Sequence, residues 1–283
     1  MNILITGANG FLAKELIEYY QDNSQISNRL LLTDRHTLDP TNFEDVRKFF
    51  DENVVDVVIH TAVKGGKRLR KDSVDDIIDN ISMFKNLSYF SDYYKIMFNF
   101  GSGAEFDRMR AINKAKETSI HTRNPRDYYG LSKKIISTKI VESDSNIYNL
   151  RLFGCFGRNE EPQRLFRSCY DKFRSGKDAQ ISYDKYMDYF YSQDVGRVMD
   201  FIISNPRLQI PRDINLCYEG DYKLSDYAST IKRLTNSPND VMIHHKELAK
   251  SYTGDCERLK SLNIDLIGLN QGVEKCLKSW SKS

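Results

Sequence analysis

The chain has 283 residues, of which 40% are hydrophobic and 29% charged, a composition that excludes a disordered protein and a small disulfide-dependent scaffold. Forty-two basic against 39 acidic residues give a net charge of +3, and Lys67–Lys71 is the single basic run, which is too little to indicate a nucleic-acid partner. No apolar run approaches the roughly 18 residues that span a bilayer, and the five cysteines form no C-x-x-C pair. We therefore expect a cytoplasmic protein with reduced thiols, no metal site and no membrane or nucleic-acid partner.

Strand and helix patterns alternate along the first half of the chain. Apolar runs predict strands over Asn2–Thr6, Leu30–Leu32, Val54–His60, Ile96–Phe100 and Tyr148–Phe153. Helical spacing of apolar residues predicts helices over Phe11–Tyr20, Asn42–Phe50, Ile77–Tyr94 and Tyr128–Val141. Strands of nearly continuous Val, Ile and Leu are typical of a parallel sheet that is covered on both faces. The alternation therefore predicts an α/β fold built on a doubly wound parallel sheet.

The alternation weakens after Gly157. Helices are predicted over Leu165–Arg174 and Leu224–Leu234, and strands over Met187–Tyr191 and Val241–His245. This pattern indicates a smaller C-terminal α/β lobe. We expect residues 1–160 to form the first domain and residues 161–283 the lobe, with part of 187–216 returning to the first domain.

A glycine-rich loop connects the first predicted strand to the first helix. Gly7 allows a tight turn and Gly10 the close approach of a ligand, while free N–H groups at the helix start can receive a pyrophosphate. The pattern is G-x-x-G-x-x-A, one residue wider between its first glycines than G-x-G-x-x-G. It predicts a Rossmann-type domain that binds a dinucleotide through Gly7, Asn9, Gly10, Phe11 and Leu12.

The second predicted strand is followed by Asp34 and Arg35. An acid at this place binds the ribose hydroxyls of the cofactor, whereas an arginine accepts a 2′-phosphate. The two side chains point to opposite sides of the strand, and Asp34 on the cofactor side would repel the phosphate that Arg35 attracts. We favour NADPH as the cofactor, with NADH as the alternative. Leu38 and Asp39 are expected to form the edge of the adenine pocket.

Tyr129 and Lys133 are four residues apart in a predicted helix, which places them one turn apart on the same face. The ordinary pKa of tyrosine is about 10, and a nearby ammonium group stabilises the phenolate and brings that pKa toward the range useful for proton transfer. Ser102 follows the fourth strand, at the edge where open α/β sheets bind ligands. Ser102, Tyr129 and Lys133 are therefore the predicted catalytic residues, and the last two are also expected to contact the cofactor.

Together these residues resemble the extended short-chain dehydrogenases/reductases, which include nucleotide-sugar epimerases, dehydratases and reductases. The members in family order are the glycine loop, Leu38-Asp39, His60-Thr61-Ala62, Ser102 with Phe106, and Tyr129 with Lys133. Within the family, the chain is most similar to the GDP-L-fucose synthase-like 4-keto reductases, through Thr33–Arg35, Val46–Phe50, Ala62–Gly66 and Ile214–Leu216.

The resemblance implies a division of labour between the two parts of the chain. Residues 1–160 would bind NADP(H), with Thr61, Ala62 and Val63 among its contacts, and residues 161–283 would bind a nucleotide-diphosphate sugar. It also implies that the C4 ketone of the sugar receives a hydride while Tyr129 protonates O4.

Several family positions are altered in this chain. Dehydratases carry an acidic pair immediately after the serine, where this sequence has Gly103 and Ala104. Fucose synthases epimerise C3 and C5 with a cysteine and a histidine, where this chain has Ala104 and Arg164. In place of their diphosphate-binding arginine, this chain has Asp188. The sequence therefore predicts a reductase without epimerase activity. Its candidate substrate contacts are Lys64, Gly103, Ala104, Arg108, Arg164 and Lys185.

Two alternatives to a reductase remain open at this stage. An NAD-dependent nucleotide-sugar 4-epimerase is favoured by Asp34, and a non-catalytic NADP(H)-binding sensor or scaffold is compatible with the fold alone. The resemblance further implies a homodimer built from the helices Ile77–Tyr94 and Tyr128–Val141. Apolar candidates for its interface are Phe84, Leu87, Ile136 and Ile140.

Overall fold

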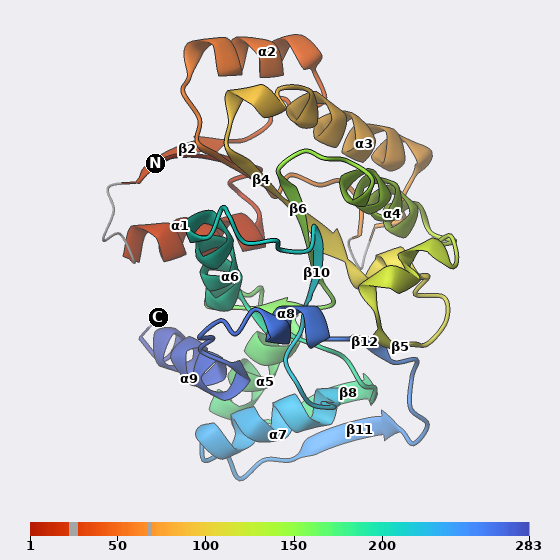
Figure 1. Ribbon diagram of the computed structural model, residues 1–283. Coiled ribbons are helices and arrows are strands. Elements are labelled where there is room, and N and C mark those ends of the chain that lie inside the picture. The colour runs from red at the N-terminus through yellow and green to blue at the C-terminus, as the bar shows by residue number, and fades with distance from the viewer. Residues whose placement is uncertain (23–27, 67–69, 283) are drawn as a thin grey trace.

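A parallel sheet forms the centre of the larger lobe (Figure 1). The structure is a computed structural model that describes residues 1–22, 28–66 and 70–282. Within these residues the sheet has six strands. The strand order is β10-β6-β4-β3-β1-β2. Their bounds are β1 Asn2–Thr6, β2 Arg29–Thr33, β3 Val57–His60, β4 Ile96–Ser102, β6 Ile147–Leu152 and β10 Asp213–Leu216. The order reverses between β1 and β3, so a crevice opens where the carboxyl ends of these two strands diverge. The doubly wound α/β sheet predicted from the sequence is confirmed.

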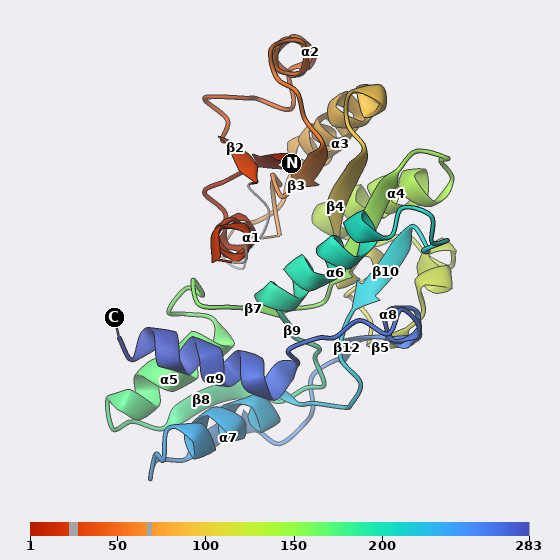
Figure 2. The ribbon, with the colours of Figure 1, turned by 60° about the vertical axis from the view of Figure 1, so that its left-hand side comes forward.

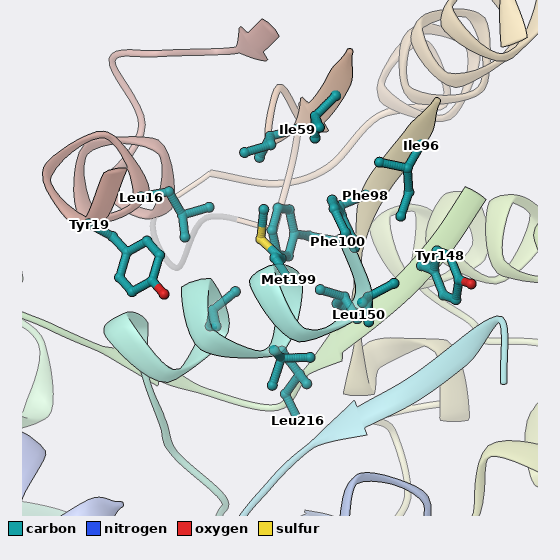
Figure 3. Close-up of a cluster of buried hydrophobic side chains, with 14 of the residues drawn as sticks. Leu16, Tyr19, Ile59, Ile96, Phe98, Phe100, Tyr148, Leu150, Met199 and Leu216 are labelled. Carbon is teal, nitrogen blue, oxygen red and sulfur yellow. The ribbon is translucent and has the colours of Figure 1, made fainter. Parts of the chain in front are cut away.

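Helices cover both faces of this sheet. One face carries α1 (Phe11–Asp22) and α6 (Ser192–Ser204), and the other carries α2 (Phe43–Glu52), α3 (Val74–Tyr89) and α4 (Tyr128–Val141). Successive residues of a strand point to opposite faces, so Ile3 and Ile5 pack in the core beneath α1 and α6 while Leu4 packs beneath α2 to α4. Figure 3 shows the first of these cores, where side chains of α1 and α6 meet those of the strands.

The smaller lobe has its own core and lies at one end of the sheet, below the sheet in Figure 1. Figure 2 shows α9 as one of the helices of this lobe. It consists of β7 (Cys155–Phe156), α5 (Leu165–Arg174), β8 (Ala179–Tyr183), β9 (Phe190–Tyr191), α7 (Leu224–Leu234), β11 (Val241–His245) and α9 (Leu269–Trp280). Aromatic rings fill this core: Phe156 stacks on Phe166 at 4.4 Å between centroids, and Tyr227 and Trp280 are buried beside them.

The chain passes several times between the two lobes. After β9 pairs with β7, it returns to the large sheet through α6 and β10 before it builds α7. A short pairing of β5 (Ile112–Ala115) with β12 (Tyr252–Gly254) then ties the C-terminal part to the larger lobe, followed by α8 (Glu257–Ser261). Short 3-10 helices cover Ser91–Tyr93, Gly103–Phe106 and Glu117–His121. This connectivity brings residues from the end of the chain to the carboxyl edge of the sheet.

Some predicted elements have different limits or surroundings. The run Leu30–Leu32 is not a buried central strand: β2 is the sheet edge, and Leu32 is 43% exposed. The third strand begins at Val57 because Val54 lies exposed before it, and α3 ends at Tyr89 rather than Tyr94. Eight α-helices and strands of the described residues were not predicted from the sequence: α6, α8, α9, β5, β7, β8, β10 and β12.

The apolar residues predicted for a dimer contact are buried within the chain itself. Phe84, Leu87, Ile136 and Ile140 lie in the core between α3, α4 and the sheet, so they cannot form an interface between copies. This part of the prediction was wrong because these side chains of both helices pack against the chain's own sheet.

Within the described part of the chain, no helix is long and apolar enough to cross a membrane. The same residues contain no group of three His, Cys, Asp or Glu side chains arranged to hold a metal ion. Of the predicted basic run Lys67–Lys71, residues 67–69 lie outside the described residues.

Candidate active site

A cavity of about 1010 Å³ lies at the carboxyl edge of the sheet, between the two lobes. Its lining brings together predicted residues that are up to 175 positions apart in the chain, from Gly10 to Lys185. The predicted members are Gly10, Phe11, Leu12, Thr61, Val63, Ser102, Arg108, Tyr129, Lys133, Arg164 and Lys185. A volume of this size suits an extended ligand or two ligands side by side.

The glycine loop has the backbone that a phosphate cradle needs. Gly7 has a φ of +69°, and a Cβ there would lie 2.8 Å from Cα of Ala62, so only glycine fits this turn. Thr61 donates its hydroxyl to the Thr6 carbonyl at 2.6 Å, which fixes the segment after β3 beside the loop. The start of α1 lies next to this cradle and directs backbone N–H groups toward the crevice. The loop therefore fits the pyrophosphate of a dinucleotide.

The carboxylate of Asp34 is engaged within its own turn. It accepts hydrogen bonds from the backbone N–H groups of His36 and Thr37, at 2.9 and 3.2 Å, and from the Asn9 amide at 3.3 Å. These backbone donors lower the pKa of Asp34. Arg35 is exposed, while Leu38 is buried in the core between the sheet and α2.

Asp39 is likewise committed to local structure. Its carboxylate accepts hydrogen bonds from the N–H and the hydroxyl of Thr41, at 2.9 and 2.7 Å. Leu38 and Asp39 lie just after the turn that begins at Asp34, and their place at the edge of an adenine pocket stays a prediction. Neither of them lines the large cavity itself.

Ser102, Tyr129 and Lys133 meet at the centre of the cavity lining. Ser102 ends β4, and α4 begins at Tyr128, with Asp127 capping it through Gly130 N–H at 2.8 Å. The Lys133 ammonium lies 5.9 Å from the Tyr129 ring centroid and donates to the Phe100 carbonyl at 2.8 Å. A serine hydroxyl, a phenol and an ammonium thus line one wall, a combination that can position a carbonyl oxygen and supply it with a proton.

The ionisation of this cluster differs from the sequence-based expectation. Burial raises the pKa of Tyr129, although the hydrogen bond to Ser102 acts in the opposite direction, and burial lowers the pKa of Lys133 to about 8. The expected lowering of the tyrosine pKa by Lys133 is therefore absent from this structure, because the loss of hydration dominates. A phenol with a raised pKa holds its proton at neutral pH, so Tyr129 is ready to act as an acid.

The model of the NAD dependent epimerase/dehydratase family matches residues 3–217 of the sequence. The chain belongs to this family. It is accordingly an NAD(P)-dependent oxidoreductase with a Rossmann-type domain. No curated protein sequence shows significant similarity to the chain.

Solved structures of epimerase/dehydratase-type proteins share the whole fold at low sequence identity. The chain superimposes on a GDP-D-glycero-L-gluco-heptose synthase from Campylobacter jejuni with a TM-score of 0.84, 19% identity, and coverage of 100% of this chain and 98% of that one. A GDP-mannoheptose C4 reductase from the same organism, with NADP bound, superimposes with a TM-score of 0.83 and 19% identity, over 100% of this chain and 98% of that one. A GDP-L-fucose synthetase from Naegleria fowleri superimposes with a TM-score of 0.79 and 17% identity, over 100% of this chain and 93% of that one.

Three predicted substrate contacts do not reach the cavity. The Lys64 ammonium is paired with Asp79 of α3, outside the lining. Ala104 is fully buried, and a Cβ on Gly103 would lie 2.4 Å from the Phe153 ring. The lining therefore does not support these three residues as substrate contacts, because Lys64 is held by α3 and Phe153 packs beside Gly103.

The other predicted cations do face the cavity. The Arg108 guanidinium carbon lies 5.7 Å from the Tyr129 ring centroid, and one of its nitrogens contacts Asp127 at 2.8 Å. Arg164 lies over the Phe11 ring at 4.8 Å, beside the cofactor loop. Among the described residues, these two, Lys133, Lys185 and Lys250 give the lining five cations against the carboxylate of Glu247, a balance that favours an anionic ligand.

A buried ion-pair network holds the end of β4 in place. Arg151 of β6 is fully buried and donates to Glu105 at 2.7 Å, and Glu105 accepts the backbone N–H of Ser102 at 2.8 Å. Asn215 and Ser137 accept two further hydrogen bonds from the guanidinium, each at 2.9 Å. Ser102 is therefore positioned by charged groups that no sequence motif indicates.

Tyr252 is a further residue of the site that sequence reasoning missed. Its hydroxyl lies 3.3 Å from the Ser102 hydroxyl, although 150 residues separate the two in the chain. It stands in a short strand without a recognisable motif, so no local pattern could have assigned it. The pairing of β12 with β5 is what brings it to the carboxyl edge of the sheet.

Proposed function

We propose that this protein uses NADPH to reduce the C4 ketone of a nucleotide-diphosphate 4-keto sugar, a GDP-linked hexose or heptose, without epimerising C3 or C5. The observation that carries the proposal is the meeting of Ser102, Tyr129 and Lys133 in a cavity that is lined by cations. The choice of a GDP-linked sugar and of C4 reduction is supported by the names of two structural neighbours, a GDP-heptose synthase and a GDP-mannoheptose C4 reductase.

The proposed chemistry needs one hydride and one proton. The nicotinamide cofactor supplies the hydride to C4 when it is bound. Ser102 donates a hydrogen bond to the ketone oxygen, and Tyr129 transfers its proton to that oxygen as negative charge develops there. The Lys133 ammonium stabilises the phenolate that remains on Tyr129. This stabilisation is needed because a phenolate is less stable in a buried place than in water. Arg108, Arg164 and Lys185 are the proposed contacts of the substrate diphosphate.

Epimerisation would need a base beside C3 or C5, and this chain lacks one at the two positions that the family resemblance assigns to that task. Ala104 has no titratable group, and the guanidinium of Arg164 stays protonated. Cys155 does line the cavity, but burial raises the pKa of its thiol, so the thiolate is scarce at neutral pH. These three residues therefore favour reduction without proton exchange at carbon, and Glu247 is the carboxylate of the lining whose action as a base the next experiment tests.

We expect a product without carbon-bound deuterium when the reaction runs in D₂O with NADPH. The substrates are GDP-, UDP-, CDP- and dTDP-linked 4-keto sugars, and the product is inspected by NMR. A GDP-L-fucose synthase run in parallel is the positive control for exchange. Deuterium at C3 or C5 in the absence of an added epimerase would contradict the proposal and would point to a base other than the residues at 104 and 164.

We expect NADPH to bind more tightly than NADH, and Arg35→Ala to abolish the difference. A charge-assisted hydrogen bond between a guanidinium and the 2′-phosphate is worth on the order of 1.5–3 kcal/mol, which is a factor of about ten or more in affinity. Asp34 is already satisfied by its own turn, so the arginine is free to set the preference. Fluorescence titration of both cofactors measures it, with Arg47→Ala as a surface control. Equal or tighter binding of NADH by the parent protein would identify Asp34 as the selecting residue.

Two other functions remain as alternatives with distinct outcomes. An NAD-dependent 4-epimerase would bind NADH preferentially and interconvert the C4 epimers of a nucleotide sugar without net cofactor consumption. A sensor or scaffold would bind NADP(H) and turn over none of the substrates in the panel. The intact Ser102, Tyr129 and Lys133 cluster favours the reductase over the scaffold.

The proposal includes a homodimer in the cytoplasm. All five cysteines are free thiols, which is the state that a reducing compartment maintains. The dimer would use α3 and α4 through residues other than the four buried ones, such as Ile78, which is 56% exposed. Light scattering distinguishes a dimer from the 32.9 kDa monomer.

A further inference from the structure

The position of Tyr252 is fixed by its backbone and ring rather than by its hydroxyl. Its N–H donates to the Tyr186 carbonyl at 2.8 Å, and its own carbonyl accepts the Asp188 N–H at 3.2 Å. The ring packs edge-on against Phe153, with 5.4 Å between centroids. A Cβ on Gly103 would lie 2.9 Å from Cζ of Tyr252, so the glycine leaves the room that this ring occupies. The hydroxyl is thus held beside Ser102 by contacts that do not depend on it.

The hydrogen bonds around Ser102 determine which way its proton points. A serine hydroxyl has one proton to donate and two lone pairs that accept. The backbone N–H of Ala104 already donates to the Ser102 oxygen at 3.2 Å, which uses one lone pair. A phenol is a stronger hydrogen-bond donor than an aliphatic alcohol, so Tyr252 is the favoured donor in its 3.3 Å contact with the Ser102 hydroxyl. In that arrangement the second lone pair of Ser102 is used as well.

When both lone pairs of the Ser102 oxygen accept hydrogen bonds, its hydroxyl can act toward a third group only as a hydrogen-bond donor. Tyr129 lines the same cavity as Ser102 and is hydrogen-bonded to that serine. The place into which Ser102 donates is therefore the one shared with Tyr129, where a ketone oxygen would be reduced. Successive hydrogen bonds of this kind polarise one another, so the donor strength of Ser102 rises with the Tyr252 bond.

We propose that Tyr252 is a positioning residue that orients the Ser102 proton toward the reacting oxygen and strengthens that hydrogen bond as charge develops. This inference rests on the proposed reductase function. Tyr252 acts on the reaction through Ser102 and does not itself transfer the proton. The aromatic ring contributes packing, and the hydroxyl alone contributes the orientation.

The experiment compares Tyr252→Phe, Ser102→Ala and the double variant in steady-state kinetics with NADPH and the substrate identified in the panel. The phenylalanine variant keeps the ring, so the fold and NADPH affinity should be unchanged. We expect kcat to fall about tenfold with KM within about twofold, the effect of one hydrogen bond made stronger in the transition state. In the Ser102→Ala background, the same change should lower kcat by less than about twofold. Tyr94→Phe, which removes another buried phenol hydroxyl bonded to the Leu87 carbonyl, is the matched control and should keep the parental kcat.

The outcomes separate this inference from the proposed function. If Ser102→Ala and Tyr129→Phe both keep the parental rate, the proposed function is wrong. If those two variants lose activity while Tyr252→Phe keeps the parental kcat, only the positioning role is overturned. If Tyr252→Phe lowers kcat equally in both backgrounds, Tyr252 acts on the substrate directly and the route through Ser102 is rejected. A parallel rise in KM with unchanged kcat would assign Tyr252 to substrate binding instead.

Discussion

Replacing Tyr129 with phenylalanine is expected to lower kcat about 10²–10⁴-fold, the usual contribution of a positioned acid, while NADPH still binds. The ring should stay in place because its contacts do not need the hydroxyl: a Cβ on Gly66 would lie 2.9 Å from Cε2, and Arg108 lies over the ring face. Single-turnover measurement of NADPH oxidation tests the rate, and a fluorescence titration tests cofactor binding. Tyr128→Phe, on the exposed side of the same helix, is the matched control.

Lys133→Met extends the same test to the neighbouring ammonium. We expect it to weaken both turnover and cofactor binding, because Lys133 is predicted to contact the cofactor as well as Tyr129. The Lys133 side chain is buried and donates to the Phe100 carbonyl, so its loss also leaves that carbonyl without this donor. A Tyr129→Phe enzyme with the parental rate would remove the phenol from the mechanism and leave Lys133 with a structural role only.

The parts of the fold that depend on residues close together in the sequence could be predicted. The glycine loop after Asn2–Thr6 and the Tyr129 and Lys133 pair each depend on residues within a few positions, and both occur in the structure where the pattern places them. The predicted bounds of α4, α5 and α7 agree with the structure. In α5 and α7 the apolar spacing reflects one buried helix face, whereas α4 also buries polar residues such as Ser132 and Ser137. Local patterns therefore predicted the cofactor loop and the helix that carries the candidate acid.

Features that depend on contacts distant in sequence could not be predicted. The exposure of Leu32 follows from the place of β2 at the sheet edge, which its own apolar run does not encode. The burial of Ile136 on the sheet side of α4 follows from packing, and its spacing fits a dimer face equally well. Tyr252 reaches Ser102 only because the last quarter of the chain pairs with β5. The cofactor half of the site was thus more visible in the sequence than the substrate half.

Arg151 illustrates the same limit with an energetic consequence. In the sequence, it is one basic residue at the end of a predicted strand, where a positive charge is normally exposed. In the structure, it is fully buried and contacts Glu105 at 2.7 Å and Asp213 at 3.5 Å. A buried charge is tolerated only when it is paired and hydrogen-bonded, so this network must form as a unit.

Replacing Arg151 with methionine is therefore expected to destabilise the fold by about 3–5 kcal/mol, the cost of leaving buried acidic partners without their counter-charge. Urea unfolding at pH 7, followed by circular dichroism, measures the change, and the exposed Arg47→Met should leave the midpoint nearly unchanged because its ion pairs are on the surface. Combining Arg151→Met with Glu105→Gln removes one orphaned carboxylate and should recover part of the loss. If Arg151→Met unfolds at the parental urea concentration, the buried pair contributes nothing to stability. Because Glu105 also accepts the Ser102 N–H, any folded Arg151→Met enzyme should lose kcat with its NADPH affinity retained, which ties the stability of this network to the geometry of the serine.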